Sequence, residues 1–485
     1  MYNPDVLSRR GFVAATAGLA LRPAFAQPSD LTSLTLKQAS DLLRTKRASP
    51  EELTEACLKR IEKYDPAFHA FITITAEQAR ATAREREVRT GRWRGPLHGI
   101  PIALKDNIDT AGIRTTGASE LFKDRVPAED AEVARRLKDA GAVLLGKLNL
   151  VEFAYGGNPT VTYFGTVHNP WALDRTPGGS SSGPGAAIAA DLCFGTLGTD
   201  TAGSVRNPAA NCSIVGLKPT YGRVSMRGVI PLSWTLDHVG PLSRTVEDTA
   251  ILLNVVAGYD EQDPTTVDVP VPDYTRALKM PTAKLRLGRP AAFFEGADPE
   301  VGKAVEAAIE VLRKLTAGVT DVELPSIGNP AQVWGPEALA YHAKWFAESP
   351  EKYQPATRRQ LQQSTEEKAA DYAEAVRQVE LARREIRKAF RSVDLLITPS
   401  TLTPPALIAE TPPPGGRGPG PGRNNHVPFD VFGLPAISIP CGFTAAGLPI
   451  GLQIVGAPFA ETTVLALAHA YEQATEWHLR RPPLV

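Results

Sequence analysis

Hydrophobic residues in the first part of the chain recur at the spacing of helices. Residues 34–64 carry this pattern, which predicts two helices. The second helix should start near Ser49 and Pro50, because serine caps helix N-termini and proline is tolerated in the first turn. Residues 76–89 predict a third helix. The fold is therefore expected to begin with helices.

From His98 onward, short apolar runs take turns with helical patterns, and this alternation continues to about residue 325. The predicted strands and helices of this part lie at 99–104, 131–140, 142–146, 184–190 and 192–198. Late strands and a closing helix are expected at 395–397, 436–440, 450–454 and 462–475. Strands that are apolar throughout are typical of a sheet covered by helices on both faces, so the pattern predicts an α/β fold.

The C-terminal third contains a helical region and a loop of unusual composition. Ser364 and Glu367 have the spacing of a capping box, and apolar residues after them fall on one helical stripe. This helical region, about 330–395, is expected on the substrate side of the molecule. Residues 404–428 are rich in proline and glycine, which predicts a mobile loop. A plain connector and a loop over the mouth of a site both remain open.

Composition limits the partners of the protein. The chain has 485 residues, 43% of them hydrophobic, which is enough for a large core. Lys+Arg and Asp+Glu both number 53, so no basic surplus favours binding to nucleic acid. The cysteines form neither a CxxC pair nor a cluster with histidine, and we expect buried thiols without deciding whether they pair; they are Cys57, Cys193, Cys212 and Cys441.

The first residues have the pattern of an export signal. Arg9 and Arg10 form a twin-arginine pair, an apolar run follows to Leu21, and Ala24 and Ala26 provide a small-residue cleavage site. The run is about half of the roughly 20 residues that a membrane crossing needs. We therefore expect a twin-arginine signal peptide at 1–26, one domain at 27–485, a periplasmic or secreted location and no stable membrane anchor.

Candidate chemistry lies in two glycine-rich segments around Ser180 and Ser204, which are 204 − 180 = 24 residues apart. Residues 179–183 match GxSxG, but the nucleophile elbow with that motif needs a preceding strand, and a loop precedes it here. The alternative is that both segments act together. A sharp turn at 201–204 can aim successive N–H groups at a developing oxyanion, with Ser204 as the attacking group.

The base for such a serine must come from another part of the chain. No histidine lies between the two serines, whereas Lys105 ends an apolar strand. Burial lowers the pKa of a lysine, so that its amine can accept a proton. A strand-end lysine that reaches water is the commoner case, and the residue alone does not decide between the two.

Three segments together resemble the amidase signature family: GIPIALKDNI, GGSSSGPGAAIAA and GTDTAGSVRNPAANCSIVGLKPTYGRVS. The likeness runs from about residue 31 to 475. It implies a single large domain with a mixed β-sheet core covered by helices on both faces. It also implies a catalytic set in which Ser204 is the nucleophile and Ser180, in a cis peptide, passes its proton to Lys105.

The resemblance assigns further roles around these three residues. It places an oxyanion hole at the backbone N–H groups of Thr201, Ala202, Gly203 and Ser204. It implies supporting residues at Ser181, Asp200 and Arg206. It implies a loop lining the acyl side at Ala154, Tyr155, Gly156 and Gly157. The chain departs from the usual family pattern at Ala202, where glycine is common, and at Ser182 and Pro184.

The expected function is an exported serine hydrolase that cleaves the C–N bond of a non-peptide amide to carboxylate and amine through an acyl-enzyme. The substrate is a small molecule, and no metal or organic cofactor is implied. A carbamate or ester hydrolase with the same triad is the alternative. An amidotransferase A-type subunit ranks lower, because export argues against cytosolic partners and ATP. A binding protein without activity is disfavoured by the intact catalytic positions, and a homodimer is left open.

Overall fold

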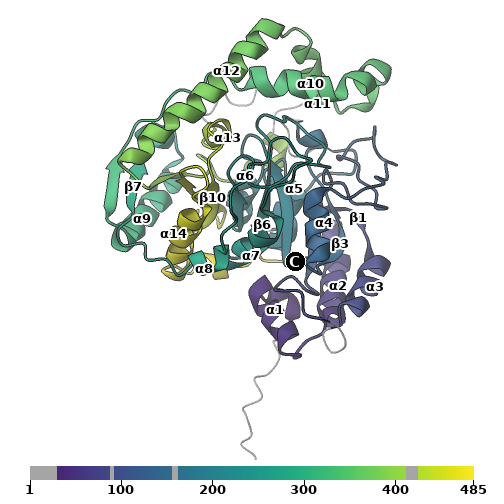
Figure 1. Ribbon diagram of the computed structural model, residues 1–485. Coiled ribbons are helices and arrows are strands. Elements are labelled where there is room, and N and C mark those ends of the chain that lie inside the picture. The colour runs from purple at the N-terminus through teal and green to yellow at the C-terminus, as the bar shows by residue number, and fades with distance from the viewer. Residues whose placement is uncertain (1–29, 88–91, 156–161, 411–423, 485) are drawn as a thin grey trace, which may run out of the picture.

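The computed structural model describes residues 30–87, 92–155, 162–410 and 424–484 (Figure 1). The predicted signal peptide at 1–26 therefore lies outside the described residues, as does the central part of the predicted loop at 404–428. The domain boundary at residue 26 stays a prediction. No helix of the described segments is long and apolar enough to cross a membrane.

Eleven strands of the described segments form one sheet at the centre of the molecule, in the order β1-β3-β2-β4-β6-β5-β10-β11-β9-β7-β8. The strands are β1 Phe71–Ile74, β2 Pro101–Lys105, β3 Val143–Leu148, β4 Gly195–Asp200, β5 Val215–Lys218, β6 His238–Ser243, β7 Arg286–Arg289, β8 Gly318–Asp321, β9 Leu395–Pro399, β10 Ala436–Phe443 and β11 Pro449–Gly456. β2 is parallel to β3 and β4, whereas β10 is antiparallel to β5 and β11. The sheet is mixed, as the family resemblance implied.

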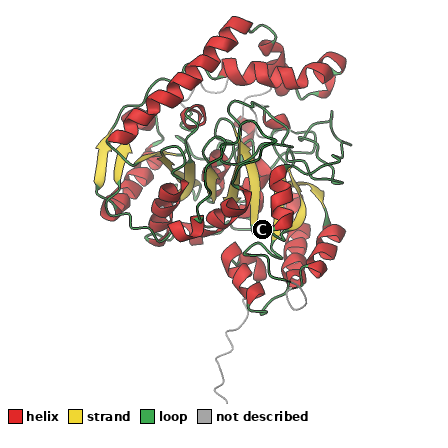
Figure 2. Cartoon of the chain, in the orientation of Figure 1, coloured by secondary structure: helices red, strands yellow, loops and turns green. Residues whose placement is uncertain are grey.

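Helices cover both faces of this sheet (Figure 2). They are α1 Leu36–Arg44, α2 Pro50–Phe68, α3 Ala76–Glu85, α4 Glu132–Asp139, α5 Ser182–Ala189, α6 Arg206–Cys212, α7 Val246–Val256, α8 Tyr274–Ala277, α9 Pro299–Leu315, α10 Ala331–Glu348, α11 Pro355–Ser364, α12 Ala369–Glu385, α13 Val427–Val431 and α14 Glu461–Gln473. On β4, a side chain at Gly195 would meet Leu252 of α7, and one at Gly198 would meet Ser181 beside α5. Residues three apart on a strand face opposite sides, so α5 and α7 lie on opposite faces.

The central strands place the two serine segments and Lys105 at one edge of the sheet. β2 ends at Lys105 and β4 ends at Asp200, and the two strands are parallel, with Leu104 opposite Leu197. The carboxyl ends of parallel strands open on the same side, where open α/β sheets bind ligands. β4 begins later than predicted, so it carries Asp200 at its last position, directly before the turn at 201–204.

The helical region at 330–395 contains α10, α11 and α12, which lie together over one edge of the sheet (Figure 1). The predicted capping box at Ser364 is wrong. Ser364 ends α11 and donates to the carbonyl of Gln360 (2.9 Å), while Lys368 occupies the N-cap of α12. A helix that starts at Pro355 has already used Ser364 in its own last turn, so the serine cannot cap the next helix.

Candidate active site

Lys105 and Ser180 are in direct contact at the carboxyl edge of the sheet. The Lys105 Nζ donates to the Ser180 Oγ (2.8 Å) and to the Thr199 Oγ1 (2.7 Å), and the lysine is fully buried. No carboxylate of a described residue pairs with this ammonium. Burial lowers the pKa of Lys105 to about 7, although the charges of Asp237 and Asp200 act in the opposite direction. Much of the amine is therefore neutral near pH 7 and can accept a proton from Ser180.

Ser180 and Ser204 open on the same pocket, which has a volume of about 360 Å³. Its lining residues are Val151, Ala154, Tyr155, Gly179, Ser180, Ala202, Ser204, Asn207, Leu232, Trp334, Gln360 and Asn424. The peptide bond before Ser180 is cis. The Ser181 N–H donates to the Ser204 carbonyl (3.2 Å), which ties the two segments together. The structure thus brings together the three residues that the resemblance assigned as the catalytic set.

The Asp200 side chain shapes the turn that carries Ser204. Its carboxylate accepts from the backbone N–H groups of Gly203 (2.6 Å) and Val205 (3.1 Å) and from the Arg206 Nε (2.9 Å). Asp200 and Arg206 are both fully buried. Burial opposes the charged form of Asp200, but the charge and hydrogen bonds of Arg206 outweigh it and hold the pKa of the carboxyl below its usual range. Asp200 therefore contacts the turn directly, and Arg206 acts on the turn through Asp200.

The backbone N–H groups of this turn differ in their partners. Among the described residues, no acceptor binds the N–H groups of Thr201, Ala202 and Ser204. The N–H of Gly203 is already bound to Asp200. Gly203 has a φ of 109°, and a side chain there would clash with the ring of His426 at 2.6 Å. Three of the four predicted oxyanion-hole donors are therefore available to a ligand.

Two of the four residues of the predicted acyl-side loop lie within the described segments. Ala154 and Tyr155 line the pocket, and the Tyr155 hydroxyl lies 3.4 Å from the Ser364 Oγ of α11. Gly156 and Gly157 lie outside the described residues. Their role in substrate binding stays a prediction. The pocket also receives side chains from α10 and α11, so the helical region contributes to its wall.

Three polar residues at this site were not predicted from the sequence: Asn107, Thr199 and Asp237. The Thr199 Oγ1 accepts from Lys105 and also from the Asn107 Nδ2 (3.1 Å). The Asp237 carboxylate accepts from the hydroxyl of Thr201. Asn107 and Thr199 stand inside the quoted motifs and could have been selected as polar residues next to the lysine and the turn. Asp237 lies in a separate segment without any recognisable pattern.

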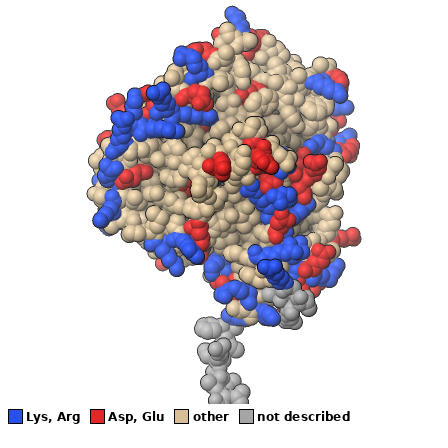
Figure 3. All heavy atoms as spheres, in the orientation of Figure 1, with Lys and Arg blue, Asp and Glu red and all other residues tan. Residues whose placement is uncertain are grey.

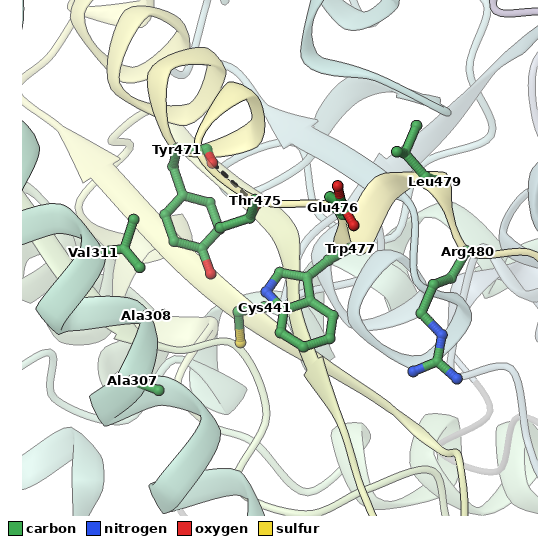
Figure 4. Close-up of a pocket in the computed structure, with 10 residues that line it drawn as sticks. All are labelled: Ala307, Ala308, Val311, Cys441, Tyr471, Thr475, Glu476, Trp477, Leu479 and Arg480. Atoms are coloured by element: carbon green, nitrogen blue, oxygen red, sulfur yellow. Dashed lines mark hydrogen bonds between the residues drawn. The ribbon is translucent and has the colours of Figure 1, made fainter.

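A second pocket of about 530 Å³ lies between α9, β10 and the C-terminal residues (Figure 4). Cys441, Tyr471 and Trp477 point into it, and none of the predicted site residues lines it. All four cysteines are buried and unpaired. Within the described segments, no group of three or more His, Cys, Asp or Glu side chains is arranged to hold a metal ion.

Comparisons with known proteins agree with the geometry of the site. The amidase family matches residues 52–465. The A subunit of glutamyl-tRNA(Gln) amidotransferase from Moorella thermoacetica is 42% identical, and the match covers 94% of this chain and 99% of that protein. The solved structure of a 6-aminohexanoate cyclic dimer hydrolase complexed with substrate is also similar, with a TM-score of 0.84 and 29% identity over 93% of this chain and 99% of that chain. The structure of the A subunit of glutamyl-tRNA(Gln) amidotransferase from Thermotoga maritima has a TM-score of 0.80 and 32% identity over 94% of this chain and 99% of that chain.

These relatives correct the expected function. The ranking that placed an amidotransferase A-type subunit below a hydrolase of non-peptide amides is wrong, because several full-length relatives at 39–42% identity are such subunits. The ranking depended on the export signal, which lies outside the described residues.

Proposed function

The chain belongs to the amidase family, and from this premise we propose that it cleaves the C–N bond of a primary carboxamide and passes the released ammonia to a partner, as an A-type amidotransferase subunit. The contact between Lys105 and Ser180, beside Ser204 in one pocket, carries the proposal. The identity to amidotransferase A subunits over 94% of the chain supports the choice of a nitrogen-releasing reaction.

The reaction begins at Ser204. Its Oγ attacks the carbonyl carbon of the amide, and its proton moves to Ser180 while the Ser180 proton moves to the neutral amine of Lys105. A hydroxyl can relay in this way because it donates and accepts at once. The carbonyl oxygen becomes negative and accepts hydrogen bonds from free N–H groups of the turn. Such donors are most effective when they are fixed before the reaction.

The same residues then release the nitrogen. The Lys105 ammonium returns a proton through Ser180 to the amide nitrogen, the C–N bond breaks, and ammonia leaves. Ser204 now holds the acyl group as an ester. Water attacks this ester with proton transfer along the same path, which frees the carboxylate and restores the hydroxyl of Ser204.

In the proposal, the binding of tRNA is the task of partner subunits. Lys+Arg and Asp+Glu are equal in number, and charges of both signs are mixed on the face shown in Figure 3. Such a surface has little net attraction for phosphates. The tRNA is therefore bound by partner subunits, and this chain acts on the small amide donor.

The test measures ammonia released by the purified chain from glutamine and other primary carboxamides, beside N-alkyl amides of the same acids. We expect ammonia from a primary carboxamide, and none after Ser204→Ala. A serine-directed fluorophosphonate should label Ser204 in the unchanged protein. Release of substituted amines without any release of ammonia would overturn the proposal.

A further inference from the structure

Asp237 is a buried carboxylate next to the active site, on the segment just before β6. One oxygen accepts from the hydroxyl of Thr201 (2.5 Å). The other accepts from the backbone N–H groups of Leu232 (2.8 Å) and Ser233 (3.0 Å). Both oxygens therefore bind groups that belong to other parts of the site.

These partners form two walls of the catalytic pocket. Thr201 begins the turn that ends at Ser204, and its neighbour Ala202 lines the pocket. Leu232 lines the same pocket. The Asp237 carboxylate therefore links the turn at 201–204 to the wall that contains Leu232. Its removal would break the hydrogen bonds to both.

A second carboxylate connects this arrangement to the helical layer. Glu337 of α10 accepts from the hydroxyl groups of Ser233 and Thr235, from the Thr235 N–H (3.2 Å) and from the Tyr372 hydroxyl of α12 (3.1 Å). Trp334, one turn earlier on α10, lines the pocket. The segment that presents Asp237 is therefore held from outside by α10 and α12.

We propose that Asp237 is a positioning residue for the reaction at Ser204: its carboxylate holds Thr201, and thereby keeps the free N–H groups of the turn aimed at the carbonyl oxygen of the substrate. This inference rests on the proposed amide cleavage at Ser204. Asp237 does not touch the reacting atoms. Donors fixed in advance stabilise the charge of the transition state, and a shift of about 1 Å costs about 100-fold in rate.

Asp237 also acts on the base through its charge. Burial lowers the pKa of Lys105, and the negative charges of Asp237 and Asp200 oppose that effect. Asp237 is itself influenced by burial, which raises its pKa to about 6, and by the nearby charge of Glu337, which acts in the same direction. The loss of its charge should lower the pKa of Lys105. A residue with a purely structural role would leave the pH dependence of the rate in place.

The experiment compares kcat, KM and the pH–rate profile of five site variants and one control variant. Asp237→Ala and Thr201→Val each remove the hydrogen bond between these two side chains. We expect kcat to fall about 10- to 100-fold and KM to change by less than about threefold. The double variant should be no slower than the slower single variant, because both changes break the same contact. Thr201→Ser keeps the hydroxyl and should keep kcat.

Asp237→Asn tests the charge of Asp237 separately from its hydrogen bond with Thr201. Its amide can still bind Thr201, Leu232 and Ser233, so it should recover most of the kcat lost in Asp237→Ala. The rising limb of its pH–rate profile should lie at lower pH than in the unchanged enzyme. In Thr201→Val that limb should not move, because no charge is lost.

The matched control is Asp248→Ala. Asp248 is also fully buried and accepts from a backbone N–H, that of Lys37 (2.9 Å), but it lies in α7 away from the pocket. The Asp248→Ala substitution should lower the free energy of unfolding, but the folded protein should keep the kcat of the unchanged enzyme. Two results would overturn the role of Asp237. One is an unchanged kcat in Thr201→Val, and the other is a double variant in which the losses of kcat from Asp237→Ala and Thr201→Val multiply in full.

The rate of Ser204 labelling by a fluorophosphonate provides a readout that needs no substrate. It should fall in Asp237→Ala and Thr201→Val and persist in Asp248→Ala. If the unchanged protein releases no ammonia from any carboxamide, the proposed function fails, while the labelling rates still decide the role of Asp237. Equal labelling in all variants would contradict that role.

Discussion

At the scale of the residue, the chemistry of Lys105 depends on where its amine is placed. The side chain is fully buried and bonded to the hydroxyl groups of Ser180 and Thr199. Neither hydroxyl compensates a positive charge as a carboxylate would, and the charges of Asp237 and Asp200 recover only part of the cost of desolvation. The same lysine at the surface would stay protonated near neutral pH and could not serve as a base.

The pH dependence of the rate should report this effect. The reaction needs the neutral amine, so activity should rise with pH as Lys105 loses its proton. Because burial lowers its pKa to about 7, the rising limb of kcat/KM against pH should be centred near 7. A limb centred near 10, where a solvated lysine titrates, would contradict the assignment of Lys105 as the base.

The substrate dependence of a lysine variant gives a second test at this scale. Lys105→Ala should lower kcat/KM more for an amide than for the matched ester. An amine must be protonated to leave, whereas an alkoxide or phenoxide needs this help less. The measurement is the ratio of kcat/KM values for both substrates in both proteins. Equal losses would indicate that Lys105 only supports the structure.

At the scale of the element, the site depends on how β4, the turn and α6 are joined. Arg206, the first residue of α6, binds Asp200 at the end of β4 and also Asp430 of α13 (2.6 Å). All three side chains are fully buried. One guanidinium therefore fixes the angle between strand and helix, and with it the turn that lies between them.

The loss of this guanidinium should destabilise the protein strongly. Arg206→Met leaves Asp200 and Asp430 as buried carboxylates without their cation, and such a change costs about 3–5 kcal/mol. The free energy of unfolding in urea measures it. Arg377→Met is the control, because Arg377 pairs with Glu374 on the exposed side of α12 and should leave the unfolding free energy unchanged. Similar values for both variants would refute the structural role of Arg206.

At the scale of the whole molecule, the export prediction and the amidotransferase proposal require different compartments. The predicted twin-arginine signal at 1–26 implies export, whereas an amidotransferase subunit that works with tRNA-binding partners needs the compartment that holds the tRNA. Both expectations concern the whole chain, and the catalytic site is the same in either compartment. Fractionation therefore decides between them without any change to the active site.

Replacement of the arginine pair gives the direct test. With Arg9 and Arg10 both changed to lysine, an exported enzyme should stay in the cytoplasm, because twin-arginine export depends on that pair. Activity is measured in the periplasmic and cytoplasmic fractions of cells with either form. If both forms lie in the cytoplasm, the export prediction is wrong and the amidotransferase proposal gains support. If both forms reach the periplasm, the twin-arginine assignment is wrong and the amidotransferase proposal loses support.

The sequence by itself determined the elements and the reactive groups. Apolar periodicity is a local property, so the early helices and the central strands were predicted close to their observed positions. The resemblance of the quoted motifs to the amidase signature family selected Lys105, Ser180 and Ser204. Local patterns failed at Ser364, where a helix-start signal stands at a helix end. The capping-box pattern is local and contains no information on the preceding helix α11, whose last turn includes Ser364.

Only the tertiary structure decided which distant groups share the pocket. The sheet order puts β2 next to β4, and this contact joins Lys105 to Thr199 across 94 positions of the chain. The segment before α5 brings Ser180 to the same amine across 75 positions. The burial that lowers the pKa of the lysine exists only after that contact forms. Asp237 is the clearest case: a lone carboxylate has no sequence signature, and the role proposed for it depends on Thr201 and Lys105, which only folding brings near it. Long-range packing sets such pairs, because desolvation and hydrogen bonding act through space and not along the chain.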